Sequence, residues 1–495
     1  MKKCEFKKLK NKKGSALLVA FLLIVVLVIV GSVSILMTVS ELRTAERQFL
    51  ANNAFHIAEA GIERVLYDMR MDYENDSTPS WQDNDINGVT FDLSTTVTTF
   101  LTSTFSDGSY VVTLHEGDSS EHAWIRSTAT VGDVTQTVEL YVKLVDVSPW
   151  DNAIFAGSGA AGSMVNGNVD VRGSVHILGS GLTSTDLAID LGGTAEFVGN
   201  NYSGLSASLA ALVPALPTTT FNGEVVETLN AELRVKSGQI GLSGSSTVGE
   251  TDVFGDGDKE TVDNVFVTDG WSGTSGSSSV YSDNGTTAAY DLGNSVVFPS
   301  LSDPAPENSL QTVQEYFESN ALVLTTELSS LNPNSSFSYT DGTNSISMDG
   351  SGNLSITGRV YIDGGNSVGL SKQGPNKTIT YSGTGTILAE GDIQIDVNLV
   401  TSGANSFPTN IMGFMTPQDI GFNEANIDVM GVFYGENQIQ VQKQTDMMGT
   451  IVSNYFDVGT NVPAIYQVPE VSNNLPIGMI GANAYAFVIE MWRRE

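Results

Sequence analysis

The stretch from Ser15 to Val39 reads SALLVAFLLIVVLVIVGSVSILMTV and contains no charged residue. As a helix rising ~1.5 Å per residue it would reach ~37 Å, more than the ~30 Å hydrocarbon core of a bilayer. Seven lysines precede this stretch, whereas the charges that follow it are of mixed sign. Because basic residues stay on the cytoplasmic side, we expect a single pass of the inner (cytoplasmic) membrane, with the N-terminus inside and the body outside.

The helical pattern continues beyond this apolar run. Phe55, Ile62, Leu66 and Met69 follow one another at spacings of seven, four and three residues, beside a stripe of small residues. No proline interrupts residues 15–71, so the sequence predicts one continuous helix of ~50 residues, ~75 Å long. Its first half is apolar on all sides, and its second half has one apolar face that another element must cover.

A lysine-rich leader ends at Gly14, and the segment AFHIAEAGIERVL follows the apolar run from Ala54 to Leu66. Together these features resemble type IV pilin-like proteins, and most of all the N-terminal region of PilX-type minor pilins. The resemblance implies that a prepilin peptidase cleaves between Gly14 and Ser15, and that Ser15 becomes the methylated N-terminus. It further implies that the partners are other pilins, minor pilins and the inner-membrane assembly machinery, and that the chain finally resides in a pilus at the cell surface.

Leu17, Leu18, Val19, Phe21 and Leu22 are the residues that we expect to anchor the chain in the membrane and later in the filament core. Val19 departs from the family pattern, because major pilins carry a glutamate at this fifth mature position. In the family, that glutamate is thought to pair with the N-terminal amine of a neighbouring subunit. The departure favours a tip or initiation subunit over a shaft subunit. A plain single-span surface protein with an uncut leader is the alternative.

The first third of the chain reads as a pilin-like α+β module. After the helix come four β-rich stretches, and Gly132-Asp133 is a suitable hairpin turn before the last of them. We therefore expect a basic prepilin leader at 1–14, the transmembrane half of the helix at 15–40, and the rest of the helix with an antiparallel meander at 41–147.

The body that follows, residues 151–495, is rich in glycine and asparagine between short strand-like runs. Related units recur at intervals of 27, 28, 18 and 18 residues, starting at Gly358, Gly385, Gly413, Gly431 and Gly449. Such spacing favours an all-β domain built as a β-solenoid, in which stacking buries the inward Ile, Val and Phe side chains. A β-sandwich has a similar composition and is the alternative. A helix-like segment near residues 307–330 is expected to interrupt the strands.

Composition excludes several classes of function. The chain has 495 residues and a net charge of −33, which opposes binding to nucleic-acid phosphates. Cys4 is the single cysteine, so an intramolecular disulfide framework and a cysteine-based zinc site are both excluded. The sequence GSGAAG at 157–162 matches a dinucleotide-binding pattern, but a strand-like stretch follows where that site needs a helix.

Few residues are candidates for chemistry. Four histidines occur without zinc spacing or a nucleophile signature, and we assign no catalytic residue. Asp252, Asp256 and Asp258 crowd one glycine-rich loop and form a weak candidate site for Ca²⁺, although the EF-hand spacing is absent. Among the basic residues of the body, only Lys259 lies in a recognisable acidic constellation. No other cofactor is expected.

We therefore predict a non-enzymatic structural minor pilin, the tip or initiation subunit of a type IV pilus-like filament. Its large β-domain would serve adhesion or surface contact, with a glycan or another cell-surface ligand as its target. Two alternatives remain open: a membrane-tethered β-helix enzyme that degrades polysaccharide, and a minor pseudopilin of a type II secretion-like system. Clustered Asp and Glu beside a Lys or Arg on one solenoid face would favour the enzyme.

Overall fold

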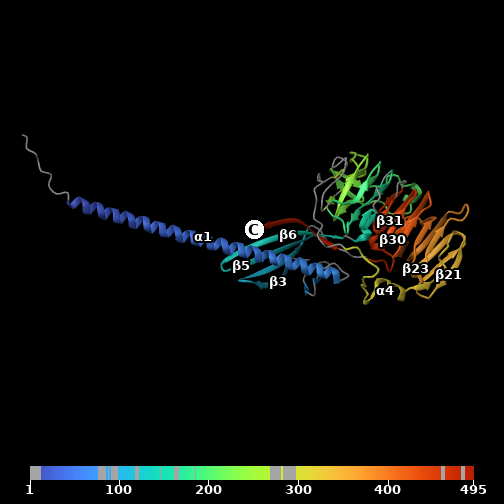
Figure 1. The fold of residues 1–495 in the computed structure, drawn as a ribbon, viewed down its shortest axis with the longest axis horizontal. Coiled ribbons are helices and arrows are strands. Elements are labelled where there is room, and N and C mark those ends of the chain that lie inside the picture. The colour runs from blue at the N-terminus through green and yellow to red at the C-terminus, as the bar shows by residue number, and fades with distance from the viewer. Residues whose placement is uncertain are drawn as a thin grey trace, which may run out of the picture. The chain divides into compact units, whose positions relative to one another are not determined.

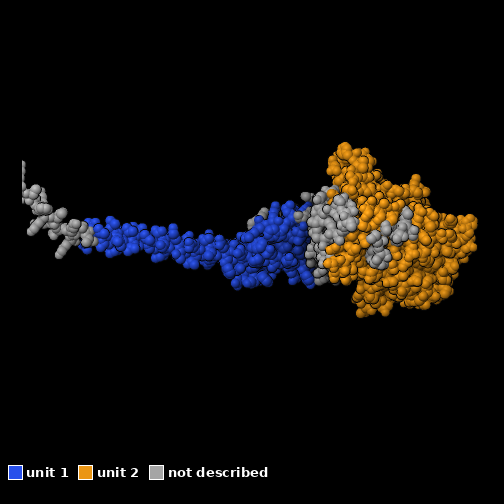
Figure 2. All heavy atoms as spheres, turned by 45° about the horizontal axis from the view of Figure 1, so that its top comes forward, with its two compact units in different colours: residues 1–145, 487–495 blue, residues 146–486 orange. Residues whose placement is uncertain are grey.

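The chain divides into two compact units (Figure 2). Unit 1 comprises residues 1–145 and 487–495, and unit 2 comprises residues 146–486. Unit 2 is thus an insertion between the last two strands of unit 1. The computed structural model describes residues 13–75, 85–86, 89–90, 98–117, 122–146, 148–160, 165, 167–183, 185–262, 264–267, 280–282, 297–458, 463–480 and 485–494. Most of the leader, including Cys4, lies outside the described residues.

One long helix, α1 (Lys13–Asn75), runs through the N-terminal part of unit 1 (Figure 1). Its 63 residues correspond to ~95 Å at the usual rise of a helix. The uninterrupted helix predicted from the sequence is confirmed, and it extends a few residues further at its C-terminal end. Without proline, nothing in this segment removes a backbone donor from the helical hydrogen-bond ladder.

An antiparallel sheet of five strands completes unit 1, in the order β3-β4-β5-β6-β33. Its strands are β3 (Thr98–Phe105), β4 (Gly108–Glu116), β5 (His122–Val131), β6 (Val134–Asp146) and β33 (Tyr485–Arg494), and a separate pair comprises β1 (Asp85–Ile86) and β2 (Val89–Thr90). The turn between β5 and β6 falls at Gly132-Asp133, where Gly132 has a φ of 61°. The chain's last strand therefore belongs to the first unit.

The second half of α1 covers one face of this sheet. Strand β5 alternates between half-buried and buried residues along its whole length, as expected of a strand with one covered face. The apolar residues of α1 that are buried are Ala54, Ile57, Ala58, Ile62, Val65, Leu66 and Met69. At Gly61 a Cβ atom would meet Ser127 and Tyr110 of the sheet, so the absence of a side chain lets the helix approach closely.

Unit 2 is almost entirely β-structure, and most of its strands join one large sheet of 20 strands. From β7 to β19 the strands are β7 (Ile154–Ala160), β8 (Asp170–Arg172), β9 (Val175–Ile177), β10 (Leu187–Leu191), β11 (Glu196–Gly199), β12 (Thr218–Phe221), β13 (Glu224–Glu227), β14 (Glu232–Val235), β15 (Gln239–Leu242), β16 (Thr247–Val248), β17 (Asn264–Val267), β18 (Pro304–Ala305) and β19 (Asn308–Thr312). From β20 to β32 they are β20 (Leu322–Leu324), β21 (Ser336–Thr340), β22 (Ser345–Asp349), β23 (Asn353–Ile362), β24 (Val368–Ser371), β25 (Thr378–Ala389), β26 (Ile393–Asp396), β27 (Asn398–Thr401), β28 (Ile411–Thr416), β29 (Asp419–Phe422), β30 (Ile427–Val441), β31 (Thr445–Asp457) and β32 (Ala464–Tyr466).

The strands of the large sheet pair mainly in parallel, and two pairs follow the glycine spacing seen in the sequence. Gly358 lies opposite Gly385 in the pair β23–β25, and Gly431 lies opposite Gly449 in the pair β30–β31. Gly413 is one residue out of this register, because it lies opposite Thr386 and Val432. At Gly449, with a φ of 134°, a Cβ would collide with the carbonyl oxygen of Gly431. The recurring glycines therefore mark a place where adjacent backbones meet closely.

The parallel strands form a stack in which a buried apolar side chain of one strand lies opposite a buried apolar side chain of the next. A continuous column of buried residues follows the parallel register: Leu322, Val360, Ile387, Phe414, Phe433, Ile451, Ile154, Val175 and Leu233. The rings of Phe414 and Phe433 stack with their centroids 5.6 Å apart. This column forms part of the core of unit 2. The residues beside it on β28, β30 and β31 are buried as well, so these strands are covered on both faces at this level.

The chain does not follow the stack from end to end. It begins at β7, proceeds through β9 and β14 to β17, and later returns from β20 through β31 to pair with β7. The beginning and end of unit 2 consequently lie side by side, where the indole nitrogen of Trp150 donates to the carbonyl of Ile480 at 2.7 Å. This arrangement suits a unit inserted between two adjacent strands.

The helical segment expected near 307–330 is shorter in the structure. Helix α4 (Val313–Ser319) has seven residues and begins with a capping box between Thr312 and Glu315. The expectation was wrong before Val313, where Asn308–Thr312 form β19 and pair with β18. It was also wrong beyond Asn320, where β20 pairs in parallel with β23. The remaining helical turns are α3 (Ala207–Ala210), η1 (Pro149–Asp151) and η3 (Ser472–Asn474).

Candidate functional site

The first half of α1 carries an apolar surface that no described residue covers. The side chains expected to lie in the membrane are more than half exposed: Leu17, Leu18, Val19, Phe21 and Leu22. This part of α1 is long and apolar enough to cross a membrane, and none of its most apolar window is buried. Gly14 and Ser15 lie in the first turns of the same helix. An exposed apolar surface of this size requires a membrane or a protein partner.

The second half of α1 is held by polar as well as apolar contacts from the last strand. Trp492 meets the Phe55 ring edge-on at 6.0 Å, and the Arg494 guanidinium lies 4.6 Å from the centre of the same ring. On the sheet, Glu139 is buried and pairs with both Arg126 and Arg493. The C-terminal strand therefore helps to hold the helix that carries the exposed surface.

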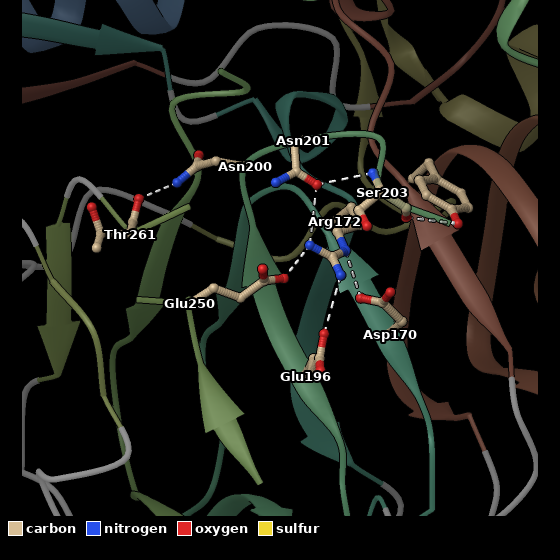
Figure 3. Close-up of polar contacts among 9 residues, drawn as sticks. Asp170, Arg172, Glu196, Asn200, Asn201, Ser203, Glu250 and Thr261 are labelled. Carbon is tan, nitrogen blue, oxygen red and sulfur yellow. Dashed lines mark hydrogen bonds and ion pairs between the residues drawn. The ribbon is translucent and has the colours of Figure 1, made fainter. Parts of the chain in front are cut away.

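Unit 2 contains a charged cluster that the sequence analysis did not find. Arg172, at the end of β8, is buried and pairs with three carboxylates (Figure 3). Its Nε lies 2.8 Å from Asp170, its Nη2 lies 3.1 Å from Glu196, and its Nη1 contacts Glu250. Nη1 also donates to the amide oxygen of Asn201 at 3.2 Å. We call these four charged residues, Asp170, Arg172, Glu196 and Glu250, the Arg172 cluster.

The parallel register brings the Arg172 cluster together. Asp170 and Glu196 lie directly opposite each other on β8 and β11. Arg172 reaches across Gly199, where a Cβ would meet the arginine side chain. Glu196 and Glu250 are 24 and 78 residues from Arg172 in sequence, so no local spacing in the sequence reveals these two partners. The only visible signal was the pattern Asp170-x-Arg172, which places both side chains on one face of a strand.

Burial dominates the electrostatics of this cluster. It raises the pKa of Asp170 to about 6, with Arg172 opposing the shift. Burial also raises the pKa of Glu250, and Arg172 again opposes the shift. Nη1 and Nη2 of Arg172 donate hydrogen bonds to Glu250, Asn201 and Glu196, whereas Nε makes an ion pair with Asp170 without hydrogen-bond geometry. With most of its donors occupied, the arginine suits a structural role better than that of a base or an electrophile.

The three aspartates of the candidate calcium site lie on one loop of unit 2. Asp252, Asp256 and Asp258 lie along the loop between β16 and β17, beside the hairpin β12–β13. Asp252 accepts a hydrogen bond from Asn222 at 3.4 Å, and the amide of Asp258 donates to Asp256 at 3.0 Å. Among the described residues, no group of three or more His, Cys, Asp or Glu side chains is arranged to hold a metal ion. The calcium hypothesis stays a prediction.

Two further candidates are placed by the structure. Lys259 is buried, and its ammonium group lies 5.0 Å from the centre of the Phe221 ring. His176 is buried against Phe155, with ring centroids 5.1 Å apart, and burial lowers its pKa to about 3. His176 is therefore neutral at physiological pH, and it packs in the body of unit 2.

Comparisons with known proteins agree with the geometry of unit 1. Residues 13–63 match the family model described as PilX N-terminal. The N-terminal segment of the chain is thus similar to type IV pilin-like proteins of the PilX kind. The matched segment contains the whole exposed apolar half of α1 and the start of its buried half.

The pilin-like chain also resembles a solved structure over most of its length. The competence-associated pilin ComZ from Thermus thermophilus aligns with 90% of this chain and 97% of its own, at 18% sequence identity and a TM-score of 0.52. At that identity the likeness concerns the fold, a long N-terminal helix followed by a large β-rich region. No curated protein matches the sequence of the pilin-like chain.

Proposed function

We propose that this chain is a non-enzymatic structural minor pilin, the tip or initiation subunit of a type IV pilus-like filament. A prepilin peptidase would cut between Gly14 and Ser15, and Ser15 would become the methylated N-terminus. The helix would first anchor the chain in the cytoplasmic membrane, with the body outside, and then pack among other pilins with the help of the assembly machinery. Unit 2 would face outward and make contact with surfaces or glycans.

The observation that carries this proposal is the exposed apolar half of α1 within the segment matched by the PilX N-terminal model. A membrane covers such a helix on all sides before assembly, and neighbouring helices cover it in a filament. The second half is already covered by the sheet of unit 1. One helix can therefore serve as an anchor and as a packing element in turn.

The size of unit 2 supports placement at a tip. A compact body of about 340 residues has a radius of gyration of ~20 Å, which would crowd a shaft if every subunit carried it. Val19 supports the same placement. In the family, a glutamate at this position pairs with the N-terminal amine of a neighbouring subunit, and a tip or initiation subunit that never meets this amine has no use for the glutamate. A carboxylate left unpaired at membrane depth costs about 2.5–3.5 kcal/mol.

We further propose that unit 2 is a β-solenoid. The parallel pairs, the aligned glycines and the continuous buried column support this reading over a β-sandwich, because sandwiches are built from antiparallel sheets. The relative from Thermus is described as competence-associated. For the present chain, a net charge of −33 opposes direct contact with DNA phosphates, so we propose contact with cell or glycan surfaces.

Immunogold labelling of an epitope in unit 2 on intact filaments tests the tip placement. We expect gold particles at one end of a filament, and none after deletion of the prepilin peptidase. Particles spaced along the shaft would overturn the tip assignment. A normal filament that lacks the protein, together with a secretion defect on its deletion, would favour the pseudopilin of a secretion system.

The Arg172 cluster gives a specific reason to test the enzyme alternative. Asp170 and Glu196 are carboxylates on adjacent strands beside an arginine, the combination that polysaccharide-degrading enzymes need. The full-length chain would be assayed for reducing ends released from neutral and anionic polysaccharides, beside an E196Q variant. We expect no release by either protein, because Arg172 is buried and its Nη1 and Nη2 donate to Glu250, Asn201 and Glu196. Release that disappears in E196Q would establish the enzyme.

A further inference from the structure

One face of unit 2 presents a regular array of amide and carboxylate side chains. It comprises the outward positions of β26, β29, the second half of β30 and the end of β31. The intervening residues Ile395, Ile420, Ile439 and Phe456 are buried. The polar side chains that alternate with them lie on the opposite face of the strands and are half-buried, and the side chain of Tyr455 is exposed. We call this surface the amide face; its residues are Gln394, Asp396, Asp419, Gln438, Gln440 and Tyr455.

Parallel pairing sets the spacing of the amide face. Asp419 lies opposite Gln438, and Gln438 lies opposite Tyr455 on the next strand. Gln394 lies opposite Gly421, which in turn lies opposite Gln440. Adjacent strands are ~4.8 Å apart, so the functional groups repeat at that interval across the strands, close to the advance of one sugar ring in an extended polysaccharide.

Hydrogen bonds fix the orientation of the amides. The Gln394 amide donates to the Gly421 carbonyl at 2.9 Å and to Asp396 at 2.8 Å. The Gln440 amide donates to the Gln438 oxygen at 3.2 Å, and the Gln442 amide donates to Gln440 at 3.1 Å. An amide oxygen has two lone pairs and an amide nitrogen two hydrogens, so the Gln438–Gln440 pair keeps donors and acceptors that can face a ligand.

The negative charge of this surface favours uncharged polymers over polyanions as ligands. Asp396 and Asp419 bring negative charge to it, and none of its six residues is a lysine or arginine. Of the nearest cations in sequence, Lys372 pairs with Glu424 at 2.6 Å, and Lys443 lies in the turn after β30. A polyanion would therefore be repelled. Sugar hydroxyls can donate to the carboxylates and accept from the amides of Gln438 and Gln440, whereas both hydrogens of the Gln394 amide are used within the protein. Tyr455 is 41% exposed and offers a ring on which the apolar face of a sugar can stack.

We propose that the amide face binds an uncharged polysaccharide that lies across successive strands, with its hydroxyls on the glutamine and aspartate side chains and one ring on Tyr455. This inference rests on the proposed role of unit 2 in surface contact, and it names the chemistry of the target.

Retention of the full-length protein, in detergent micelles, on insoluble cellulose, chitin and starch tests the proposal. Polygalacturonate and double-stranded DNA serve as polyanionic probes. We expect retention on at least one neutral polymer, and at least tenfold weaker binding for Q440E and for Y455A. The matched control is L310A, which truncates a side chain that is 93% exposed on β19; its binding should equal that of the unaltered chain.

Three results would overturn the proposal: no retention on any neutral polymer, retention on a polyanion instead, or equal binding by the amide-face variants and L310A. Circular dichroism melting of each variant shows whether a loss of binding reflects unfolding, and the conservative Q440E change keeps the side-chain volume. Filament association of the same variants is measured separately and should be normal. A chain that binds glycan but never joins filaments would reject the proposed function and leave this inference intact.

Discussion

At the scale of single residues, the strongest electrostatic feature is the guanidinium of Arg172, enclosed by three carboxylates. Removing one partner of a buried charged group leaves the others uncompensated, which typically costs about 3–5 kcal/mol. The cluster therefore predicts that unit 2 depends on this arginine more than on any exposed ion pair.

The variant R172A should lose about 3 kcal/mol of unfolding free energy at pH 7, measured by urea denaturation of the full-length chain. The control is K372A, which removes the partly exposed pair with Glu424 and should cost about 1 kcal/mol or less. Equal losses of unfolding free energy in the two variants would show that the Arg172 cluster does not stabilise unit 2 more than an exposed ion pair does.

Glu260 gives the chain a pH dependence of defined sign. Burial, with Asp256 and Glu250 adding repulsion, raises the pKa of Glu260 from 4.5 to about 7. The folded chain therefore holds this proton more tightly than the unfolded chain, so the stabilisation is present below about pH 4.5 and is lost as the pH rises through about 7. E260Q should accordingly raise the melting temperature at pH 8 and leave it nearly unchanged at pH 4.5.

The variant E424Q provides a control of opposite sign. The hydrogen bond from Lys372 lowers the pKa of Glu424, so its stabilisation is present at neutral pH and is lost on acidification through the lowered pKa. E424Q should therefore lower the melting temperature at pH 8, where E260Q raises it. Shifts of the same sign at pH 8 would contradict the assigned environments.

At the scale of elements, two of the three glycines in α1, Gly31 and Gly61, have contrasting surroundings. A Cβ at Gly61 would meet Ser127 and Tyr110, whereas a Cβ at Gly31 would have no neighbour within 4 Å. G61A should destabilise unit 1 by about 1–3 kcal/mol because the helix must move away from the sheet. G31A should be neutral or slightly stabilising, since alanine favours the helix. Thermal unfolding followed by circular dichroism tests the pair, and equal effects would contradict the packing.

The strand β33 supports a second prediction at this scale. Removing residues 485–495 exposes the edge of β6 and takes away the Arg493 partner of the buried Glu139. We expect limited proteolysis to cut unit 1 of the truncated chain at least tenfold faster, while the fragments of unit 2 persist. R494A, which alters only the exposed contact with Phe55 and Gln136, should leave the cleavage rate within twofold. Unchanged cleavage after truncation would show that β33 is dispensable.

The sequence predicted the elements better than their pairing. The uncharged run after Gly14 and the absence of proline predicted α1, because helix formation depends on residues that are close together in the sequence. The glycine spacing matched the register of two strand pairs, Gly358 opposite Gly385 and Gly431 opposite Gly449, where adjacent backbones approach closely. In contrast, the order of the stack, the return of β33 to the first sheet and the Arg172 cluster depend on strands far apart in sequence. No local pattern specifies which distant strands become neighbours.

At the scale of the whole molecule, the chain combines a pilin-like unit with a large inserted β-unit. The insertion has its two ends together, as the bond between Trp150 and Ile480 shows, so it can interrupt a sheet without separating the strands on either side. The exposed half of α1 then decides where the molecule resides, because neither unit covers it among the described residues. The proposed function requires that this helix first anchor the chain in the membrane and later become a component of the filament.

Mass spectrometry of the N-terminal peptide from protein in sheared surface filaments tests this claim most directly. The account predicts a mature chain that begins at Ser15 and carries one methyl group on its amine, and an uncut chain that stays in the membrane when the peptidase is deleted. An intact Met1, or an N-terminus at another position, in filament-associated protein would contradict it.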